Sequence, residues 1–141
     1  MIGAMLAQVL AAGATFTCTP VAVWDGDGPI WCAEGPKIRL AGIAAREMDG
    51  SCRKSHPCPK ASARAARNAL VGLLGGSRGT LRTGQISIRA PTMRCVSHGS
   101  ARGTRTAALC TLPAVGDLSC AMVRTNTAAR WDRYGGARLC R

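Results

Sequence analysis

The chain has 141 residues, the length of one ordinary domain, which excludes two independently folded cores. It contains 19 Lys and Arg against 7 Asp and Glu, and the resulting formal net charge of +12 favours anionic partners: nucleic acid, an acidic membrane surface or a polyanionic wall polymer. With 17 glycines and a single phenylalanine, the core is expected to consist of Val, Ile, Leu and Ala with a few tryptophans.

The chain begins with an apolar stretch, MIGAMLAQVLAAGA, which ends in the small-x-small pattern Ala12-Gly13-Ala14 typical of a signal-peptidase site. This stretch is too short to span a bilayer as a stable helix. We expect residues 1–14 to be a signal peptide, with a disordered or packed N-terminal arm as the alternative, and residues 15–141 to form a single domain. A signal peptide predicts a secreted or periplasmic protein.

Eight cysteines in so short a chain indicate a disulfide framework and hence an oxidising compartment. The sequence has no paired CxxC motifs that would support a zinc site. Eight cysteines allow many pairings, so several connectivities stay open. The candidates are Cys18, Cys32, Cys52, Cys58, Cys95, Cys110, Cys120 and Cys140.

Residues 16–32 predict a β-hairpin, because a run of β-branched and aromatic residues is followed by the turn sequence DGDG and a second extended run. Cys18 and Cys32 lie equally far from Asp25 along the chain, so a disulfide across this hairpin is a natural pairing. Residues 37–44, KIRLAGIA, predict a third strand by their alternation.

Residues 59–76 predict a helix with Pro59 in its first turn and a glycine pair at its end. Its apolar stripe consists of Ala63, Ala66, Leu70 and Leu73. Three basic residues share another face, which is either solvated or contacts a phosphate backbone: Lys60, Arg64 and Arg67. Before this helix, a disulfide between Cys52 and Cys58 would close a short loop.

Residues 85–90 and 93–96 are predicted to be extended, and residues 106–111 are predicted to be extended again after a loop. Cys95 and Cys110 bracket that loop, SHGSARGTR, almost symmetrically. They are therefore a second candidate for a disulfide across a hairpin.

The stretch LSCAMVRTNTA has apolar residues at helical spacing and predicts a second helix. Asp117 is a suitable N-cap, and Asn126 is able to take the left-handed turn at the end of this helix. The last stretch, ARWDRYGGARLCR, is expected to be helical or irregular and to be tied back by Cys140, with Cys120 as a candidate partner.

The predicted order is three strands, a helix, two or more strands and a second helix. This order belongs to the α+β class and fits a five-stranded OB-fold β-barrel with two to three α-helices, an architecture that commonly binds nucleic acid. An α+β sandwich with the same element order is the alternative.

Two acids and two arginines follow predicted strands in a way that suits phosphodiester hydrolysis. A barrel mouth would bring them together: Asp27, Arg39, Glu47 and Arg105. One carboxylate can hold a divalent metal ion, the second can activate water, and two guanidinium groups can stabilise charge on the phosphate oxygens. The planar guanidinium matches phosphate oxygens in pairs, which lysine does not.

These residues, within VWDGDGPIWC, KIRLAGIAAREMDGSC and GTRTAALC, resemble the staphylococcal nuclease-like (thermonuclease) family over roughly residues 18–134. The resemblance implies an OB barrel with added helices and calcium-dependent hydrolysis of DNA and RNA. It also implies that Asp27 binds the metal ion and that Glu47 is the general base. The two arginines that would hold the phosphate are Arg39 and Arg105.

The sequence departs from the family pattern at three places. Ala44 stands where the family has a second metal-binding aspartate, and Arg46 stands beside the proposed general base. Because Ca²⁺ prefers about six or more oxygen ligands, the missing carboxylate is expected to weaken binding of the ion. Before Arg105, the residues Arg102-Gly103-Thr104 lack the aromatic side chain with which many relatives stack a base. Arg102 itself is a candidate contact to nucleic acid.

Three functional hypotheses remain. The first is a metal-dependent nuclease acting on DNA or RNA, and the second is a catalytically silent relative that binds nucleic acid or another polyanion. The third is a disulfide-stabilised envelope protein with neither activity. The aspartates of DGDG could serve the turn alone, and His56 and His98 are expected to be surface loop residues rather than ligands.

Overall fold

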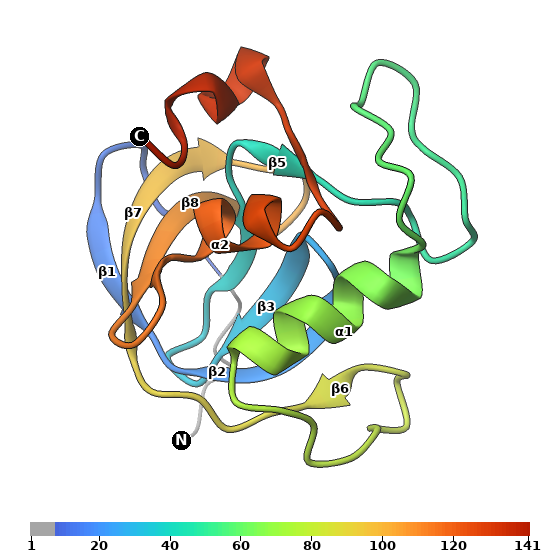
Figure 1. The fold of residues 1–141 in the computed structure, drawn as a ribbon. Helices are drawn as coiled ribbons and strands as arrows, with labels where there is room; N and C mark the ends of the chain where they lie inside the picture. The colour runs from blue at the N-terminus through green and yellow to red at the C-terminus, as the bar shows by residue number, and fades with distance from the viewer. Residues whose placement is uncertain (1–7) are drawn as a thin grey trace.

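A mixed β-sheet with two α-helices forms the fold of residues 8–141, the part of the chain that the computed structural model describes (Figure 1). The first half contains β1 (Thr15–Cys18), β2 (Pro20–Asp25), β3 (Gly28–Cys32), β4 (Lys37–Leu40), β5 (Ile43–Ala44) and α1 (Ala63–Leu73). The second half contains β6 (Ile86–Ser87), β7 (Met93–Ser100), β8 (Arg105–Leu112), β9 (Gly116–Asp117), α2 (Leu118–Arg124) and β10 (Ala129–Arg130). Two 3-10 turns follow, Asp132–Tyr134 and Gly136–Arg138.

Eight of these strands form one strongly curled sheet in the order β1-β7-β8-β4-β3-β2-β6, with β9 added beside β8 (Figure 1). The pairing of β4 with β8 is parallel, and the other pairings are antiparallel. The predicted α+β class is confirmed. Among the described strands, the end strands β1 and β6 do not pair with each other, so the pairing does not close into a barrel.

The first predicted strand is interrupted at Thr19. β1 pairs with β7, whereas β2 pairs with β3, so the two pieces join different neighbours. Pro20 begins β2, and since proline has no backbone N–H to donate, it is tolerated at the first position of a strand. The backbone N–H and the hydroxyl of Thr19 both donate to the carboxylate of Glu34, which holds the chain at this break.

The first helix begins later than predicted. Ser62, not Pro59, sets its start, because the Ser62 hydroxyl accepts from the backbone N–H of Ala65 at 3.0 Å and caps the helix. Lys60 therefore lies outside the helix. The predicted apolar stripe is confirmed at its centre, where Ala66 and Leu70 are fully buried. Gly75 follows the last turn with a φ of +98°, the left-handed conformation that glycine adopts without strain.

The second helix matches the prediction at both ends. The Asp117 carboxylate accepts from the backbone N–H of Cys120 at 2.8 Å, which caps its first turn. Asn126 has a φ of +61° and takes the left-handed turn after the helix. The helix contacts both β8 and α1, so the two helices pack together on the sheet (Figure 1).

Four disulfides stabilise the fold, and all four candidate pairings are confirmed. They are Cys18–Cys32, Cys52–Cys58, Cys95–Cys110 and Cys120–Cys140. This framework fits the predicted oxidising compartment. The loop between β7 and β8 is shorter than predicted, because β7 continues to Ser100 and the next strand begins at Arg105.

The core is aliphatic, as expected, except that the tryptophans do not contribute to it as predicted. Its largest fully buried side chains include Ile30, Ile38, Leu40, Ile43, Leu70, Leu74, Met93, Leu118 and Met122. Trp24 and Trp31 are each 37% exposed, because their positions on β2 and β3 alternate with buried neighbours and face solvent.

Of the predicted signal peptide, residues 1–7 lie outside the described part of the chain. Residues 10–14 lie beside β7, where the backbone N–H of Gly13 donates to the carbonyl of Ser97 and the N–H of Ser97 donates to Ala14, both at 2.8 Å. Within residues 8–141, no helix is both long and apolar enough to cross a membrane.

Candidate functional site

A cavity of about 510 Å³ opens where the β2–β3 turn, β4, the loop after β5, the end of the β7–β8 hairpin and the C-terminal segment meet. The structure brings all four sequence-predicted residues to its walls: Asp27, Arg39, Glu47 and Arg105. Arg102 lines it as well. Asp25 is a third acid in its lining, beside Asp27 and Glu47, and we call this space the acidic cavity after these three residues.

Asp27 and Arg39 form the fixed centre of the acidic cavity. Their side chains are 13% and 14% exposed, and Arg39 Nη2 lies 3.2 Å from Asp27 Oδ2. Arg39 Nη1 donates to the carbonyls of Leu40 and Ile43 at 2.7 and 2.8 Å. The backbone N–H of Ala45 donates to the same Asp27 oxygen. Both groups are therefore held in place before any ligand binds.

Asp25 is buried at the β2–β3 turn. It is 5% exposed, and its Oδ1 accepts from the backbone N–H of Asp27 at 3.2 Å. Burial, followed by the negative charge of Asp27, raises the pKa of Asp25 to about 9. At neutral pH this site consequently holds one protonated carboxyl group beside the second aspartate.

Glu47 lines the acidic cavity from a turn just before the loop that the Cys52–Cys58 disulfide closes. Its side chain is 32% exposed and pairs with Arg53, with 3.3 Å between Oε1 and Nε. Arg46 turns away from this wall, because its guanidinium donates to the carbonyls of Pro59 and Gly50. The cation expected beside the proposed base is thus supplied by Arg53 rather than by Arg46.

The C-terminal segment contributes an aromatic wall that the sequence did not predict. β10 pairs with β5, and the backbone N–H of Trp131 donates to the carbonyl of Gly42 at 2.7 Å. The His56 and Trp131 rings are 4.2 Å apart, and Tyr134 meets Trp131 edge-on at 4.7 Å. The guanidinium carbon of Arg39 lies 5.5 Å from the Trp131 ring.

His56 and His98 both line the acidic cavity. His56 lies in a loop as predicted but is partly buried, whereas His98 is exposed as predicted but lies on β7. Partial burial, followed by the positive charges of Arg39 and Arg53, lowers the pKa of His56. His56 is therefore neutral at neutral pH. In the sequence, the aromatic wall is indicated only by the aromatic pair of RWDRY, and this pair does not show which strand the segment will pair with.

The three basic residues predicted to contact nucleic acid lie in α1 and just before it, away from the acidic cavity. Lys60 and Arg64 are exposed, and neither they nor Arg67 line the acidic cavity. Arg67 is partly buried, and its Nη1 donates to the carbonyl of Gly84 at 3.5 Å. A contact between this face and a phosphate backbone remains a prediction.

Within residues 8–141, no cluster of three or more His, Cys, Asp and Glu side chains is arranged to hold a metal ion. Ala44 is fully buried and offers no carboxylate. Asp25 and Asp27 are the two neighbouring carboxyl groups that could supply oxygens to a divalent cation, and a positive ion beside them would favour the ionised form of both. Two carboxylates with substrate phosphate and water are typical of Mg²⁺ sites, whereas Ca²⁺ usually takes more protein oxygens.

Comparisons with protein families, with curated proteins and with solved structures find no match to this chain. The site is therefore judged on its own geometry.

Proposed function

We propose that this protein is a metal-dependent nuclease that hydrolyses phosphodiester bonds in DNA or RNA. The observation that carries the proposal is the meeting of the Asp27–Arg39 pair with Glu47 and Arg105 in one cavity. The mixed, curled sheet with helices packed together on it supports an OB-like domain resembling the staphylococcal nuclease-like family. The four disulfides support a secreted or periplasmic location.

The arginines would bind the scissile phosphate. Arg39 is already fixed by two carbonyls and by Asp27, so it can present its remaining N–H groups with little further loss of side-chain freedom. Arg105 begins β8 on another wall of the cavity and would approach the phosphate from a second direction. Together they would stabilise the negative charge that develops on the phosphate oxygens.

Glu47 would accept a proton from a water molecule while the oxygen of that water forms a bond to phosphorus. The bond from phosphorus to the leaving oxygen would break, and the leaving oxygen would take a proton from solvent water. Asp25 and Asp27 would hold a divalent cation, which when bound neutralises phosphate charge. The family resemblance implies Ca²⁺, whereas a site with only two carboxylates is more typical of Mg²⁺. The ion pair between Glu47 and Arg53 must break for this step. Because both side chains are partly exposed to solvent, breaking the pair costs little free energy.

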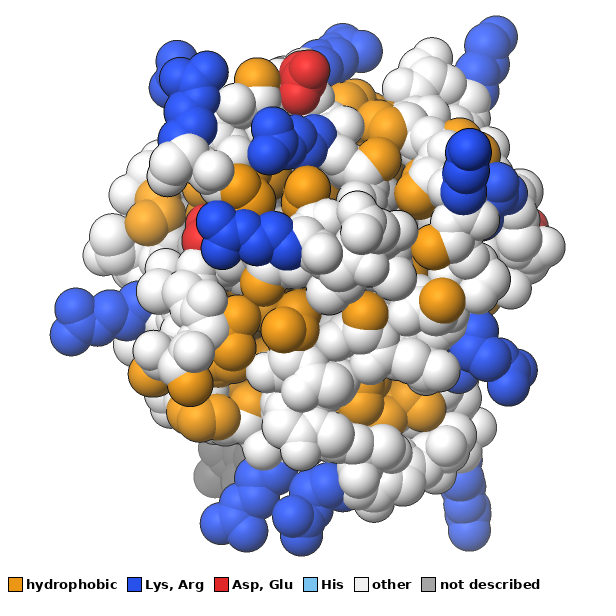
Figure 2. Space-filling view, in the orientation of Figure 1, with side chains coloured by type: hydrophobic (Ala, Val, Ile, Leu, Met, Phe, Trp, Pro, Cys, Tyr) orange, Lys and Arg blue, Asp and Glu red, His pale blue; other side chains and the backbone are white. Residues whose placement is uncertain are grey.

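The second candidate is a domain that binds nucleic acid without cutting it. Two observations favour it: Ala44 removes a metal-binding carboxylate, and Arg53 neutralises the proposed base. The basic side chains spread around the face in Figure 2, with few acids between them, would serve either function. The third candidate, an envelope protein with neither activity, predicts no affinity for nucleic acid.

The test is cleavage of single-stranded DNA and RNA by the oxidised protein with Ca²⁺, Mg²⁺, Mn²⁺ or EDTA. Glu47→Gln should abolish turnover, and Asp49→Asn, which replaces an exposed acid outside the cavity, should leave it unchanged. Cleavage that Glu47→Gln does not reduce would remove Glu47 from the mechanism. No cleavage with any metal ion, with binding retained, would favour the second candidate.

A further inference from the structure

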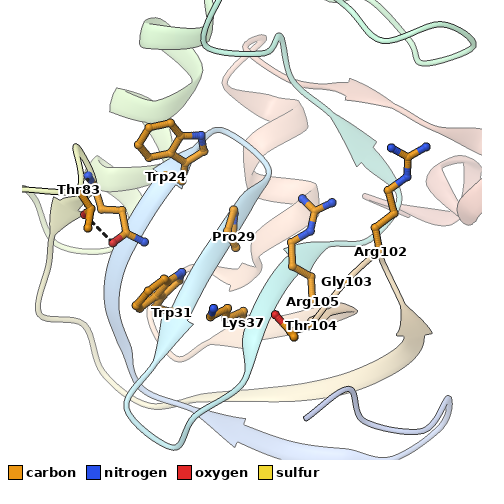
Figure 3. A pocket seen from close by; sticks show the side chains of 10 residues that line it. Trp24, Pro29, Trp31, Lys37, Thr83, Arg102, Gly103, Thr104 and Arg105 are labelled. Atoms are coloured by element: carbon orange, nitrogen blue, oxygen red, sulfur yellow. Dashed lines mark hydrogen bonds between the residues drawn. The ribbon is translucent and has the colours of Figure 1, made fainter. Parts of the chain in front are cut away.

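A second cavity of about 500 Å³ lies on the outer side of the sheet, where β2, β3, β4 and β8 run next to one another (Figure 3). Two tryptophans and three cations dominate its walls. We call this the Trp31 surface and define it by Trp24, Trp31, Lys37, Arg102 and Arg105. The described residues that line it include no acid.

The strand register places three of these side chains in one row. Trp31 on β3 pairs with Lys37 on β4, and Lys37 pairs in turn with Arg105 on β8 (Figure 3). Side chains that share such a row point to the same face of the sheet. The Lys37 ammonium lies 4.5 Å from the centre of the Trp31 ring, so the row holds an aromatic ring and two positive charges side by side.

The two tryptophans are placed at the surface although the core lacks large aromatic side chains. Both are 37% exposed, and Trp24 packs against Gly84, where an added Cβ would come within 3.1 Å of its ring. Tryptophan in the core would remove more apolar area from water, so fold stability does not explain these positions. An exposed aromatic group surrounded by cations instead indicates a binding surface.

The Trp31 surface continues into the acidic cavity. Arg102 and Arg105 line both spaces, and they stand at the end of the β7–β8 hairpin where the two meet. On β4, Lys37 and Arg39 are two positions apart and so share one face of the strand, Lys37 in the surface and Arg39 in the cavity. A line of positive charge therefore leads from Trp31 to Asp27.

We propose that the Trp31 surface binds single-stranded nucleic acid, and that the bound strand continues into the acidic cavity. The proposal rests on the proposed function, because it supplies the path of that enzyme's substrate. Phosphates would lie along Lys37, Arg102 and Arg105, while bases stack on the tryptophan rings. A duplex keeps its bases stacked on one another and presents only phosphates to such a surface, so it would lose the aromatic contribution.

The test measures binding without cleavage. The Glu47→Gln protein, oxidised and in Ca²⁺, is titrated with a fluorescent 12-nucleotide oligo(dT) and with a 12-base-pair duplex. Adding Trp31→Ala should weaken binding of oligo(dT) about tenfold, the loss of one stacked base. It should change duplex binding less than twofold. Trp31→Phe should recover most of the lost affinity, because phenylalanine still stacks. Arg94→Ala, an exposed cation of β7 outside both cavities, is the matched control and should change little.

A second variant keeps the test decisive if Trp31→Ala fails to fold. Lys37→Gln should make the dependence of oligo(dT) affinity on salt shallower by about one phosphate contact. Unchanged affinity in Trp31→Ala together with an unchanged salt dependence in Lys37→Gln would overturn the proposal. An equal loss for oligo(dT) and duplex in Trp31→Ala would also overturn it, because that result means that Trp31 supports the neighbouring cation and stacks no base.

The surface and the enzyme can fail separately. Cleavage that depends on Glu47, with no effect of Trp31→Ala on binding, would overturn the surface and leave the proposed function standing. Absence of cleavage with a tenfold effect of Trp31→Ala would support the surface and overturn the nuclease.

Discussion

The carboxyl group of Asp25 links the stability of this protein to pH. Burial first, and then the charge of Asp27, raise its pKa from the ordinary 3.8 to about 9. The folded protein thus holds a proton that the unfolded chain releases above pH 3.8. The free energy of unfolding should therefore fall as pH rises from about 4 to about 9, by up to about 1.4 kcal/mol for each pH unit.

Asp25→Asn removes this titration and should flatten the decline. In EDTA, the substituted protein should become more stable than the parent as pH rises above 7, as urea denaturation at several pH values would measure. Asp49→Asn, which changes an exposed carboxylate, is the control and should keep the decline. If the parent protein were equally stable at pH 5 and pH 8, the raised pKa that follows from the burial of Asp25 would be contradicted.

Gly26 decides how closely α1 approaches the two aspartates. A Cβ at this position would overlap the Cβ of Ala66, which is fully buried on the helix. Gly26→Ala should therefore destabilise the protein by about 1–3 kcal/mol, the usual cost of overpacking. Gly72, on the same helix, faces open space, and Gly72→Ala should stabilise it by about 0.5–1 kcal/mol. Urea denaturation of both variants checks the contrast.

At the scale of elements, the C-terminal segment depends on the Cys120–Cys140 disulfide to keep Trp131 at the acidic cavity. This crosslink spans 20 residues, and its loss in the Cys120→Ser, Cys140→Ser protein should cost about 3 kcal/mol. The short strand β10 would then hold the segment with only two paired residues. We expect faster cleavage by a protease after Arg130 or Arg133 and weaker binding of oligo(dT).

The Cys52–Cys58 disulfide spans only 6 residues and is the comparison for this prediction. Its removal should cost less, about 2 kcal/mol, and should leave β10 protected from protease. Equal proteolysis of the C-terminal segment in both double variants would mean that Cys120–Cys140 does not anchor it.

Sequence reasoning succeeded for elements whose signals are local. The caps at Asp117 and Asn126 were predictable from local patterns, and the four disulfides found were each a candidate pairing among connectivities that the sequence leaves open. It failed where the outcome depends on distant partners. The break at Thr19 arises because β1 finds β7, and the place of Trp131 beside Arg39 arises because β10 finds β5.

The candidate site shows the same division. The DGDG turn, the third strand and the start of β8 placed Asp27, Arg39 and Arg105 near one another in prediction, and the structure gathers them in one cavity. The pKa of Asp25 is raised by burial, and this burial comes from packing of distant segments that no local sequence pattern predicts. The pairing of Glu47 with Arg53 depends on the shape of a disulfide-closed loop.

For the whole molecule, the net charge of +12 attracts nucleic acid in general. A single nucleic acid strand bound along the two cavities would contact only a few of these charges. Four cations line the proposed path: Arg39, Lys37, Arg102 and Arg105. Four phosphate contacts predict that affinity for oligo(dT) falls about fiftyfold between 50 and 200 mM salt. A much steeper loss would mean that the strand wraps around the protein, and no loss would mean that phosphates are not contacted.

The disulfides divide the covalent structure of the chain. Two close loops before residue 59 and two close loops after residue 94, so none joins the first half to the second. The exposed stretch 77–83 lies between them, and one cut there would leave two fragments that only strand pairing and packing hold together. Asp27 and Arg39 would lie on one fragment and Arg105 on the other. The acidic cavity is thus assembled from two separable pieces of chain, and neither piece contains it alone.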